Sequence, residues 1–512
     1  MSIKNPLIRG TIILTIAGFA SRFIGFFYRI FLSQAIGAKG MGIYQLIFPI
    51  HGFCFSLCTA SIQTAISRYV AVEAEKNPRS GRRVLAVGLT VSLVLSCLCT
   101  FVIYSFSDFI AVHLLFEPRC SYLLQIMALT IPVGSVHSCI CGYYLGLQNA
   151  SVSGWSQLFE QIIRVCSVIL IATVLSENGR GITPSLAVFG MLFGEIASMI
   201  YCMLYYYGSK TAKKKAVSYI TKPLSYHKIF ILLMSMSIPL TLNRVMISLL
   251  QSVEASFIPL KLREFGLSTD AAISIYGVLT GMSLTFILFP SAVTNSIAVM
   301  LLPSVSKAQA QGSTLTLKNS ITLCTRFCLW IGLLCTGVFL VYGKNLGTIL
   351  FHNQEAGIYI QILSWLCPFL YLSTTFGSIL NGCGKTSITF LQNAAALVVR
   401  ILFIWFAIPR YGIIGYLWGL LVSQLFLTLL YYVYIQKLLG FLIPVWQMIT
   451  RPLFLLFFAV GIGFSVQWLV LYLPVPKICS LFSAITCTCG LFGGVMWREF
   501  RHSLFQSKSN TP

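Results

Sequence analysis

Seven arginines and three glutamates lie within apolar stretches of the sequence, where charge is costly. The arginines are Arg22, Arg29, Arg68, Arg164, Arg244, Arg326 and Arg400, and the glutamates are Glu160, Glu195 and Glu254. A charge at the centre of a bilayer costs about 2.5–3.5 kcal/mol on insertion scales, so such groups face a cavity or pair with one another. Arginine stays protonated and can bind phosphate through two parallel hydrogen bonds. The surplus of arginine suits an anionic substrate better than a cationic drug.

Depth within the apolar stretches separates these arginines. Arg68 and Arg326 lie near predicted cytoplasmic helix ends, where the long side chain can extend to the interface. Arg29 lies toward an outer end, and the other four lie near the middle of their helices. We therefore expect a substrate site drawn from Arg22, Arg29, Arg164, Arg244 and Arg400.

The glutamates allow two interpretations. Glu160 and Arg164 are four residues apart, so they share a helix face and can form an ion pair. Glu195 and Glu254 have no such local partner, and they could pair with distant arginines or bind a coupling cation. Spacing alone does not decide between pairing and ion coupling.

Other catalytic and metal-binding signals are weak. Gly384-Lys385-Thr386 resembles part of a P-loop, but Ile379 occupies the position where that motif needs glycine. The pairs Cys139/Cys141 and Cys487/Cys489 lack histidine or carboxylate neighbours at ligand spacing. No Ser/His/Asp set or paired-carboxylate site converges. We expect neither an enzyme nor a metal or cofactor site.

The composition explains why these charges are conspicuous. The chain has 512 residues, of which 57% are hydrophobic and 9% charged, against roughly 25% charged in soluble domains. A polytopic membrane protein is indicated. The net charge of +23 would be assigned to loops facing an anionic leaflet, and no basic segment with interleaved aromatics suggests nucleic-acid binding.

Fourteen stretches are long and apolar enough to span a membrane. They cover residues 7–33, 41–72, 84–107, 120–147, 152–176, 182–208, 228–258, 271–303, 318–342, 357–380, 388–408, 412–436, 452–473 and 478–497. With a cytoplasmic N-terminus, 20 Lys and Arg fall in inside loops and 8 in outside loops, as the positive-inside rule requires. Arg22 and Arg29 follow the first apolar run in place of a cleavage site, so we expect an uncleaved first helix and both termini inside.

An internal repeat is visible at an offset of 236 residues. Gly146 precedes Arg164 by 18 residues, and Gly382 precedes Arg400 by 18 residues. Six-helix parallel repeats are a known transporter plan with a site between the halves. We predict an N-lobe at 1–208, a basic cytoplasmic linker at 209–228, a C-lobe at 229–437, and two extra helices with a short tail at 438–512.

Several segments carry a family resemblance. Ser21-Arg22-Phe23-Ile24-Gly25-Phe26, Ile36-Gly37-Ala38-Lys39-Gly40 and Gln63-Thr64-Ala65-Ile66-Ser67-Arg68 resemble the sporulation members of the polysaccharide-transporter branch of the MATE-like (MOP) flippase superfamily. One departure is that lipid II flippases carry a second arginine soon after the proline matched by Pro49, where this chain has His51.

The resemblance implies an all-helical fold of two lobes with alternating access in a bacterial cytoplasmic membrane. It also implies a lipid-linked saccharide pyrophosphate as cargo, with lipid II for spore-cortex peptidoglycan as the implied precursor. Arg22 matches the first-helix arginine of the cationic cavity. Membrane lipids, and a coupling cation or the membrane potential, would be the other partners.

Two other functions remain open. An ion-coupled multidrug exporter of the same fold would require Glu195 or Glu254 to bind a cation. The other is a non-transporting membrane scaffold or a polytopic glycosyltransferase. A glycosyltransferase would need a catalytic acid pair at the membrane edge, and no such pair is visible.

Overall fold

The computed structural model describes residues 6–177, 182–208, 224–295, 305, 314–472 and 476–509. Every secondary-structure element in these residues is helical. Twelve of the described helical segments can span a membrane, and a bent pair, Gln354–Leu363 with Leu366–Gly382, makes a thirteenth. The first segment, Ile13–Glu73, covers two predicted spans, so the fourteen predicted spans all have helical counterparts. The predicted all-α polytopic fold is confirmed.

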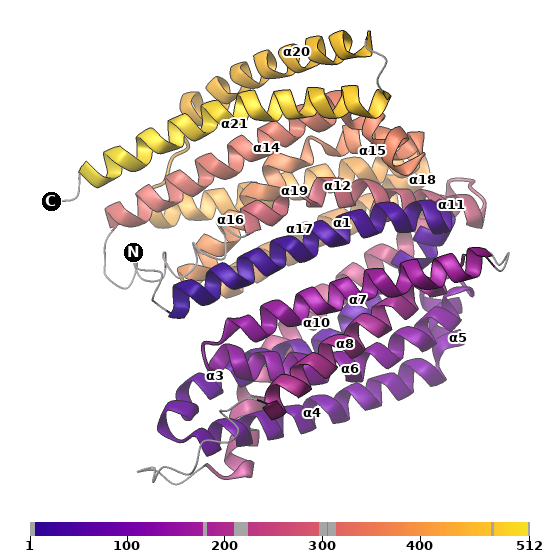
Figure 1. Ribbon diagram of the computed structural model, residues 1–512, viewed down its shortest axis with the longest axis vertical. Coiled ribbons are helices and arrows are strands. Elements are labelled where there is room, and N and C mark those ends of the chain that lie inside the picture. The colour runs from indigo at the N-terminus through magenta and orange to yellow at the C-terminus, as the bar shows by residue number, and fades with distance from the viewer. Residues whose placement is uncertain are drawn as a thin grey trace. The chain divides into compact units, whose positions relative to one another are not determined.

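The chain divides into two compact units, Met1–Gly281 and Met282–Pro512. Helices of the first unit include a parallel-running group, α4, α6, α7 and α8, that lies side by side in Figure 1. The elements of this unit are α1 (Pro6–Leu46), α2 (Phe48–Phe55), η1 (Ser56–Ala60), α3 (Ser61–Lys76), α4 (Pro78–Ser105), α5 (Ser107–Phe109), η2 (Ile110–Leu114), α6 (Cys120–Gly146), α7 (Ala150–Glu177), α8 (Ser185–Gly208), α10 (Tyr226–Glu264) and α11 (Thr269–Gly277).

In the second unit, α14, α20 and α21 lie side by side (Figure 1). Its elements are α12 (Leu284–Leu288), α14 (Thr314–Phe351), α15 (Gln354–Leu363), α16 (Leu366–Gly382), α17 (Thr386–Phe406), α18 (Ile408–Tyr411), α19 (Ile413–Leu439), η4 (Trp446–Thr450), α20 (Arg451–Leu471) and α21 (Lys477–Ser509), while η3 (Val278–Ser283) crosses the division. The lobe boundaries predicted from the sequence stay a prediction, and most of the predicted linker, residues 209–223, lies outside the described residues.

Local sequence signals set the helix ends. Asn77 caps α4, with its side-chain oxygen accepting from the Arg79 backbone N–H at 2.9 Å and Pro78 in the first turn. α1 is broken at Gly37, whose φ of 69° lies in the region that favours glycine. This break separates the two predicted spans that share the first helical segment.

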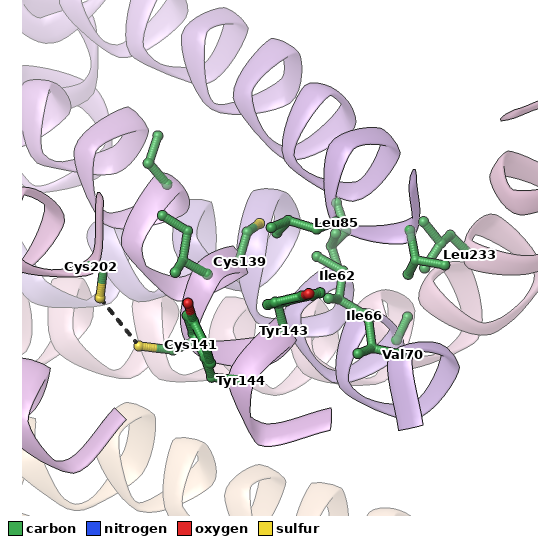
Figure 2. Packing of buried hydrophobic residues seen from close by; sticks show 14 of the residues in the cluster. Ile62, Ile66, Val70, Leu85, Cys139, Cys141, Tyr143, Tyr144, Cys202 and Leu233 are labelled. Atoms are coloured by element: carbon green, nitrogen blue, oxygen red, sulfur yellow. Dashed lines mark hydrogen bonds between the residues drawn. The ribbon is translucent and has the colours of Figure 1, made fainter. Parts of the chain in front are cut away.

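The core of the first unit fills the space between α3, α4, α6, α8 and α10. Figure 2 shows Ile62, Ile66 and Val70 of α3 close to Tyr143 of α6. On the opposite side of α6, the sulfur of Cys141 lies 3.7 Å from that of Cys202 on α8. These cysteines are free, so here they pack as small apolar side chains.

The predicted repeat is visible in the backbone of two turns. After α6, Gln148 has a φ of 59°, and after α16, Gly384 has a φ of 74°; these positions are 236 residues apart. The Asn149 N–H donates to the Tyr144 carbonyl at 2.9 Å, and the Lys385 N–H donates to the Leu380 carbonyl at 2.9 Å. The same hydrogen bond therefore recurs at the predicted offset.

Candidate functional site

Two predicted site arginines lie within electrostatic range of each other inside the first unit. Arg29 lies on α1 and Arg164 on α7, two helices that pack against each other. Arg29 is close enough to Arg164, Tyr28 and Tyr44 for electrostatic interaction. Both tyrosines are 5% exposed, and the hydroxyl of Tyr28 is buried without a hydrogen-bond partner among the described residues. A pair of guanidinium groups beside phenol hydroxyls is an arrangement that can bind a phosphate-type anion.

Arg164 forms the predicted ion pair with Glu160, one turn earlier on α7. The two side chains are 19% and 18% exposed, so water screens this pair weakly. The Nε atom of Arg164 is buried and has no hydrogen-bond partner among the described residues. Arg164 thus keeps one donor that Glu160 does not occupy.

Glu195 on α8 pairs with a histidine. Nδ1 of His137 on α6 lies 3.0 Å from Oε2 of Glu195, and the two side chains are 13% and 10% exposed. Both atoms are buried, and neither has a hydrogen bond within the part of the chain that the structure describes. An imidazole and a carboxylate so placed share one negative charge when the imidazole is neutral and none when it is protonated.

The two pairs and Arg29 together make one group, which we call the charged cluster: Arg29, His137, Glu160, Arg164 and Glu195. The ligand-type atoms of His137, Glu160 and Glu195 all lie within 4.8 Å of one another. Three such side chains could in principle hold a metal ion, but the adjacent guanidinium groups of Arg29 and Arg164 oppose a divalent cation. The cluster is better suited to anions and protons.

Two glycines make room for the cluster. A Cβ atom on Gly134 would lie 3.2 Å from Oε2 of Glu195, and one on Gly194 would lie 3.2 Å from Cβ of Arg164. Gly134 precedes His137 by three residues on α6, so the two share a helix face. Glycine at these positions allows α6, α7 and α8 to bring their charged side chains together.

The other predicted site residues lie elsewhere. Arg22 is exposed on α1, and no hydrogen bond or ion pair joins it to another described residue. A guanidinium N–H of Arg244 on α10 donates to the hydroxyl of Thr64 on α3 at 3.3 Å. Arg400 belongs to the second unit, where its Nε–H donates to Ser423 of α19 at 3.3 Å. Glu254 is buried on α10 and lies close to Tyr276 of α11.

The two arginines expected to snorkel have partners near their helix ends. A guanidinium N–H of Arg68 donates to the sulfur of Met236 at 3.8 Å. A guanidinium nitrogen of Arg326 lies 2.8 Å from Glu499 on α21, and Arg451 lies 2.6 Å from the other oxygen of the same carboxylate. Arg326 also lies over the ring of Trp330, at 5.2 Å from its centroid.

A second ionic network in the first unit joins Lys39, Glu117, Arg119 and Asp270. Arg119 forms an ion pair with Glu117, and its guanidinium lies 2.8 Å from a carboxylate oxygen of Asp270. The other oxygen of Asp270 forms an ion pair with Lys39. Hydrogen bonding to Glu117, and then to Asp270, raises the pKa of Arg119 above its usual range. These residues were predicted to lie in outside loops, and we call them the outer network.

The sequence analysis predicted neither His137, a member of the charged cluster, nor His51, which lies within electrostatic range of that cluster. His51, near the position where the resemblance implies arginine in lipid II flippases, interacts electrostatically with Glu195 and Arg164. A titratable residue inside an apolar span is itself a functional signal. Applied to histidine as it was to arginine and glutamate, that signal would have found both residues.

Comparisons with known proteins agree with this architecture. The sequence model of the family described as "Polysaccharide biosynthesis protein" matches residues 7–309. Stage V sporulation protein B of Bacillus subtilis (strain 168) is 25% identical over 439 residues, covering 85% of each chain. The lipid II flippase MurJ of the same organism is 24% identical over 423 residues, covering 78% of this chain and 76% of that protein.

Solved structures show the same fold. A lipid II flippase MurJ in an inward closed conformation has a TM-score of 0.69 at 13% identity and covers 95% of this chain and 99% of its own. An inward-facing multidrug resistance MATE family transporter of the MOP superfamily has a TM-score of 0.65 at 11% identity, covering 83% of this chain and 98% of its own.

Proposed function

The chain belongs to the family of polysaccharide biosynthesis proteins, and from that membership we propose that it is a flippase for a lipid-linked saccharide pyrophosphate. The pyrophosphate headgroup would cross the cytoplasmic membrane by alternating access while the lipid tail stays in the bilayer. Relatives named as a sporulation protein and as a lipid II flippase support lipid II as the cargo, for spore-cortex peptidoglycan. The protein would carry out transport without a covalent reaction.

The observation that carries this proposal is that Arg29 lies within electrostatic range of Arg164, on a helix packed against it, in a membrane-spanning unit. Two guanidinium groups from different helices repel each other, and an apolar surrounding strengthens that repulsion. A bound pyrophosphate would remove it by accepting charge-assisted hydrogen bonds from both. Glu160 partly neutralises Arg164 in the absence of cargo and would compete with the headgroup for it.

The remaining predicted residues have proposed supporting roles. Arg22 would meet the headgroup from the exposed face of α1, and Arg244 and Arg400 would contribute positive potential. Both termini would face the cytoplasm, where most loop Lys and Arg are placed by the predicted topology. The membrane potential or a coupling cation would supply the driving force.

Translocation of fluorescent lipid II in proteoliposomes tests the proposal. We expect transport by the wild type, and a loss of about tenfold or more in Arg29→Gln and in Arg164→Gln, because a hydrogen bond to a charged group contributes about 1.5–3 kcal/mol. Arg410→Gln, an exposed arginine of α18, is the matched control and should transport normally.

Two results would redirect the proposal. Normal transport by both variants would keep the flippase but remove Arg29 and Arg164 from its site. Absence of lipid II transport by folded wild type, together with ion-driven export of a cationic dye, would favour the multidrug exporter of the same fold, an alternative that the MATE likeness supports only at the level of fold.

A further inference from the structure

We propose that His137, Glu195 and Glu160 form a proton-binding site whose occupancy is linked to anion binding at Arg29 and Arg164. This inference rests on the proposed function, because the anion is the cargo headgroup. It assigns the proton as the coupled ion and places it in the first unit.

The first argument is geometric. Nδ1 of His137 and Oε2 of Glu195 face each other at 3.0 Å in a nearly buried setting, and neither has a hydrogen bond among the described residues. Two facing acceptors without a proton between them repel, whereas one proton shared between nitrogen and oxygen satisfies both. The pair is therefore built to gain or lose a single proton, exchanged with the aqueous phase.

The second argument is the balance of charge. With neutral His137, two arginines balance two glutamates, so the cluster of Arg29, Arg164, Glu160 and Glu195 has no net charge. A pyrophosphate at the arginines adds negative charge, and the cluster can restore its balance by taking up a proton. Bringing a divalent cation beside Arg29 and Arg164 would be far more costly than adding one proton.

The third argument is the surroundings of His137, which determine its response to pH. Several helices place titratable or charged groups around the cluster: Tyr28, Arg29 and Tyr44 from α1, His51 from α2, Cys141 from α6, Glu160 and Arg164 from α7, and Glu195 from α8.

Only two interactions separate the proposed proton site from the proposed anion site. Glu195 interacts with Glu160, and Glu160 holds Arg164. A proton on His137 or Glu195 lowers the negative potential at Arg164 and so favours the incoming anion.

Linkage makes this inference quantitative. If a proton favours anion binding, anion binding must favour proton uptake by the same factor. We expect uptake approaching one proton for each bound anion, at its largest between about pH 6 and 8, where histidine commonly titrates. Anion affinity should rise as the pH falls through this range.

Isothermal titration of the detergent-solubilised full chain measures this uptake directly. Lipid II and inorganic pyrophosphate are the probes, each titrated in two buffers of different ionisation enthalpy with EDTA present. The dependence of the binding heat on the buffer gives the number of protons taken up. His137→Asn keeps a polar atom near the Nδ1 position but cannot be protonated, and Glu195→Gln keeps the side-chain shape without the charge.

The outcomes separate the two proposals. We expect uptake by the wild type and by the control His113→Asn, an exposed histidine of η2, and at least a threefold smaller uptake in His137→Asn and Glu195→Gln. Equal uptake in wild type and both variants, or none in the wild type, would overturn the proton site and leave the flippase intact. Pyrophosphate binding with proton uptake but no lipid II binding would keep the linkage and reject the cargo. Failure of the wild type to bind either probe would overturn both.

Discussion

Nζ of Lys39 on α1 lies 2.6 Å from Oδ2 of Asp270 on α11, although 231 residues separate them. The other oxygen of the same carboxylate lies 2.8 Å from Arg119. Beside this network the two helices touch through backbone, because a Cβ atom on Gly277 would collide with the carbonyl oxygen of Ala38 and the nitrogen of Gly42. This end of the first unit is thus held by two different kinds of contact.

These contacts should respond very differently to substitution. Gly277→Ala forces α1 and α11 apart, whereas Asp270→Asn removes two exposed ion pairs, each worth only about 0.2–1 kcal/mol. We expect Gly277→Ala to raise the hydrogen exchange of residues 38–46 and 269–277 by at least tenfold, and Asp270→Asn by less. Gly18→Ala, where no atom lies within 4 Å of the added Cβ, should leave exchange unchanged. Equal effects of Gly277→Ala and Gly18→Ala would show that the close approach is not needed.

The outer network should not act as a pH switch. Because Glu117 and then Asp270 raise the pKa of Arg119, its stabilising charge is fully present below the ordinary pKa of arginine and is lost only above the raised value. Hydrogen exchange of residues 269–277, corrected for intrinsic rates, should therefore be constant between about pH 6 and 8. A loss of protection within this range would show that the stabilising effect of the network depends on pH.

Removing the carboxylate of Glu160 should separate affinity from stability. Glu160→Gln leaves Arg164 without its counter-ion, so the thermal unfolding midpoint should fall, because an unpaired buried charge costs about 3–5 kcal/mol. The same change should strengthen pyrophosphate binding by about tenfold, and saturating pyrophosphate should restore much of the midpoint. Glu177→Gln, exposed at the end of α7, is the control. Weaker binding by Glu160→Gln would mean that Glu160 does not compete with the anion.

A single methyl group should disturb the proposed proton site without removing a titratable residue. The added Cβ of Gly134→Ala would lie 3.2 Å from Oε2 of Glu195 and displace it from His137. Proton uptake on pyrophosphate binding should fall to a value between those of wild type and Glu195→Gln. Gly52→Ala, which meets no atom within 4 Å, is the matched control. Unchanged uptake in Gly134→Ala would show that the approach of the two side chains is not required.

The carboxylate of Glu499 should stabilise the packing of α21 against the rest of the second unit. It receives Arg326 at 2.8 Å and Arg451 at 2.6 Å, and Arg326 is mostly buried. We expect Glu499→Gln to cost about 1–3 kcal/mol and to lower the thermal unfolding midpoint. The exposed Glu355→Gln serves for comparison. If the double variant Glu499→Gln/Arg326→Gln lost as much as the two single variants summed, the two residues would not be coupled.

Much of the fold follows from the sequence because a bilayer leaves few choices. A backbone in hydrocarbon must satisfy its own hydrogen bonds, so each long apolar run becomes a helix. The repeat was predicted from the equal spacing of Gly146 to Arg164 and of Gly382 to Arg400, and the turns after α6 and α16 match it with a positive φ at Gln148 and Gly384. The sequence predicted two separate spans where the structure has one helical segment, Ile13–Glu73, because the chain between the spans stays helical apart from the break at Gly37.

The site was less predictable, because contacts between helices depend on how they rotate. The pairing of Glu160 with Arg164 is local and was predicted from the spacing. The approach of Arg29 to Arg164 joins α1 to α7, and no spacing reports it. The partner of Glu195 was missed because His137 lies on another helix, and no spacing within one helix joins the two residues. The roles of Arg22, Arg244, Arg400 and Glu254 stay predictions.

The π-helical turn η1, Ser56–Ala60, has a consequence for how this protein can change in evolution. Such a turn is an α-helix with one residue inserted, and each residue rotates the helix by about 100°. The loosened carbonyl of Cys58 accepts a hydrogen bond from Ser92 at 2.8 Å. Deleting one codon here would turn His51 about a quarter of the way around relative to Thr64, so a lineage could redirect a side chain that interacts with Glu195 and Arg164 without replacing any amino acid.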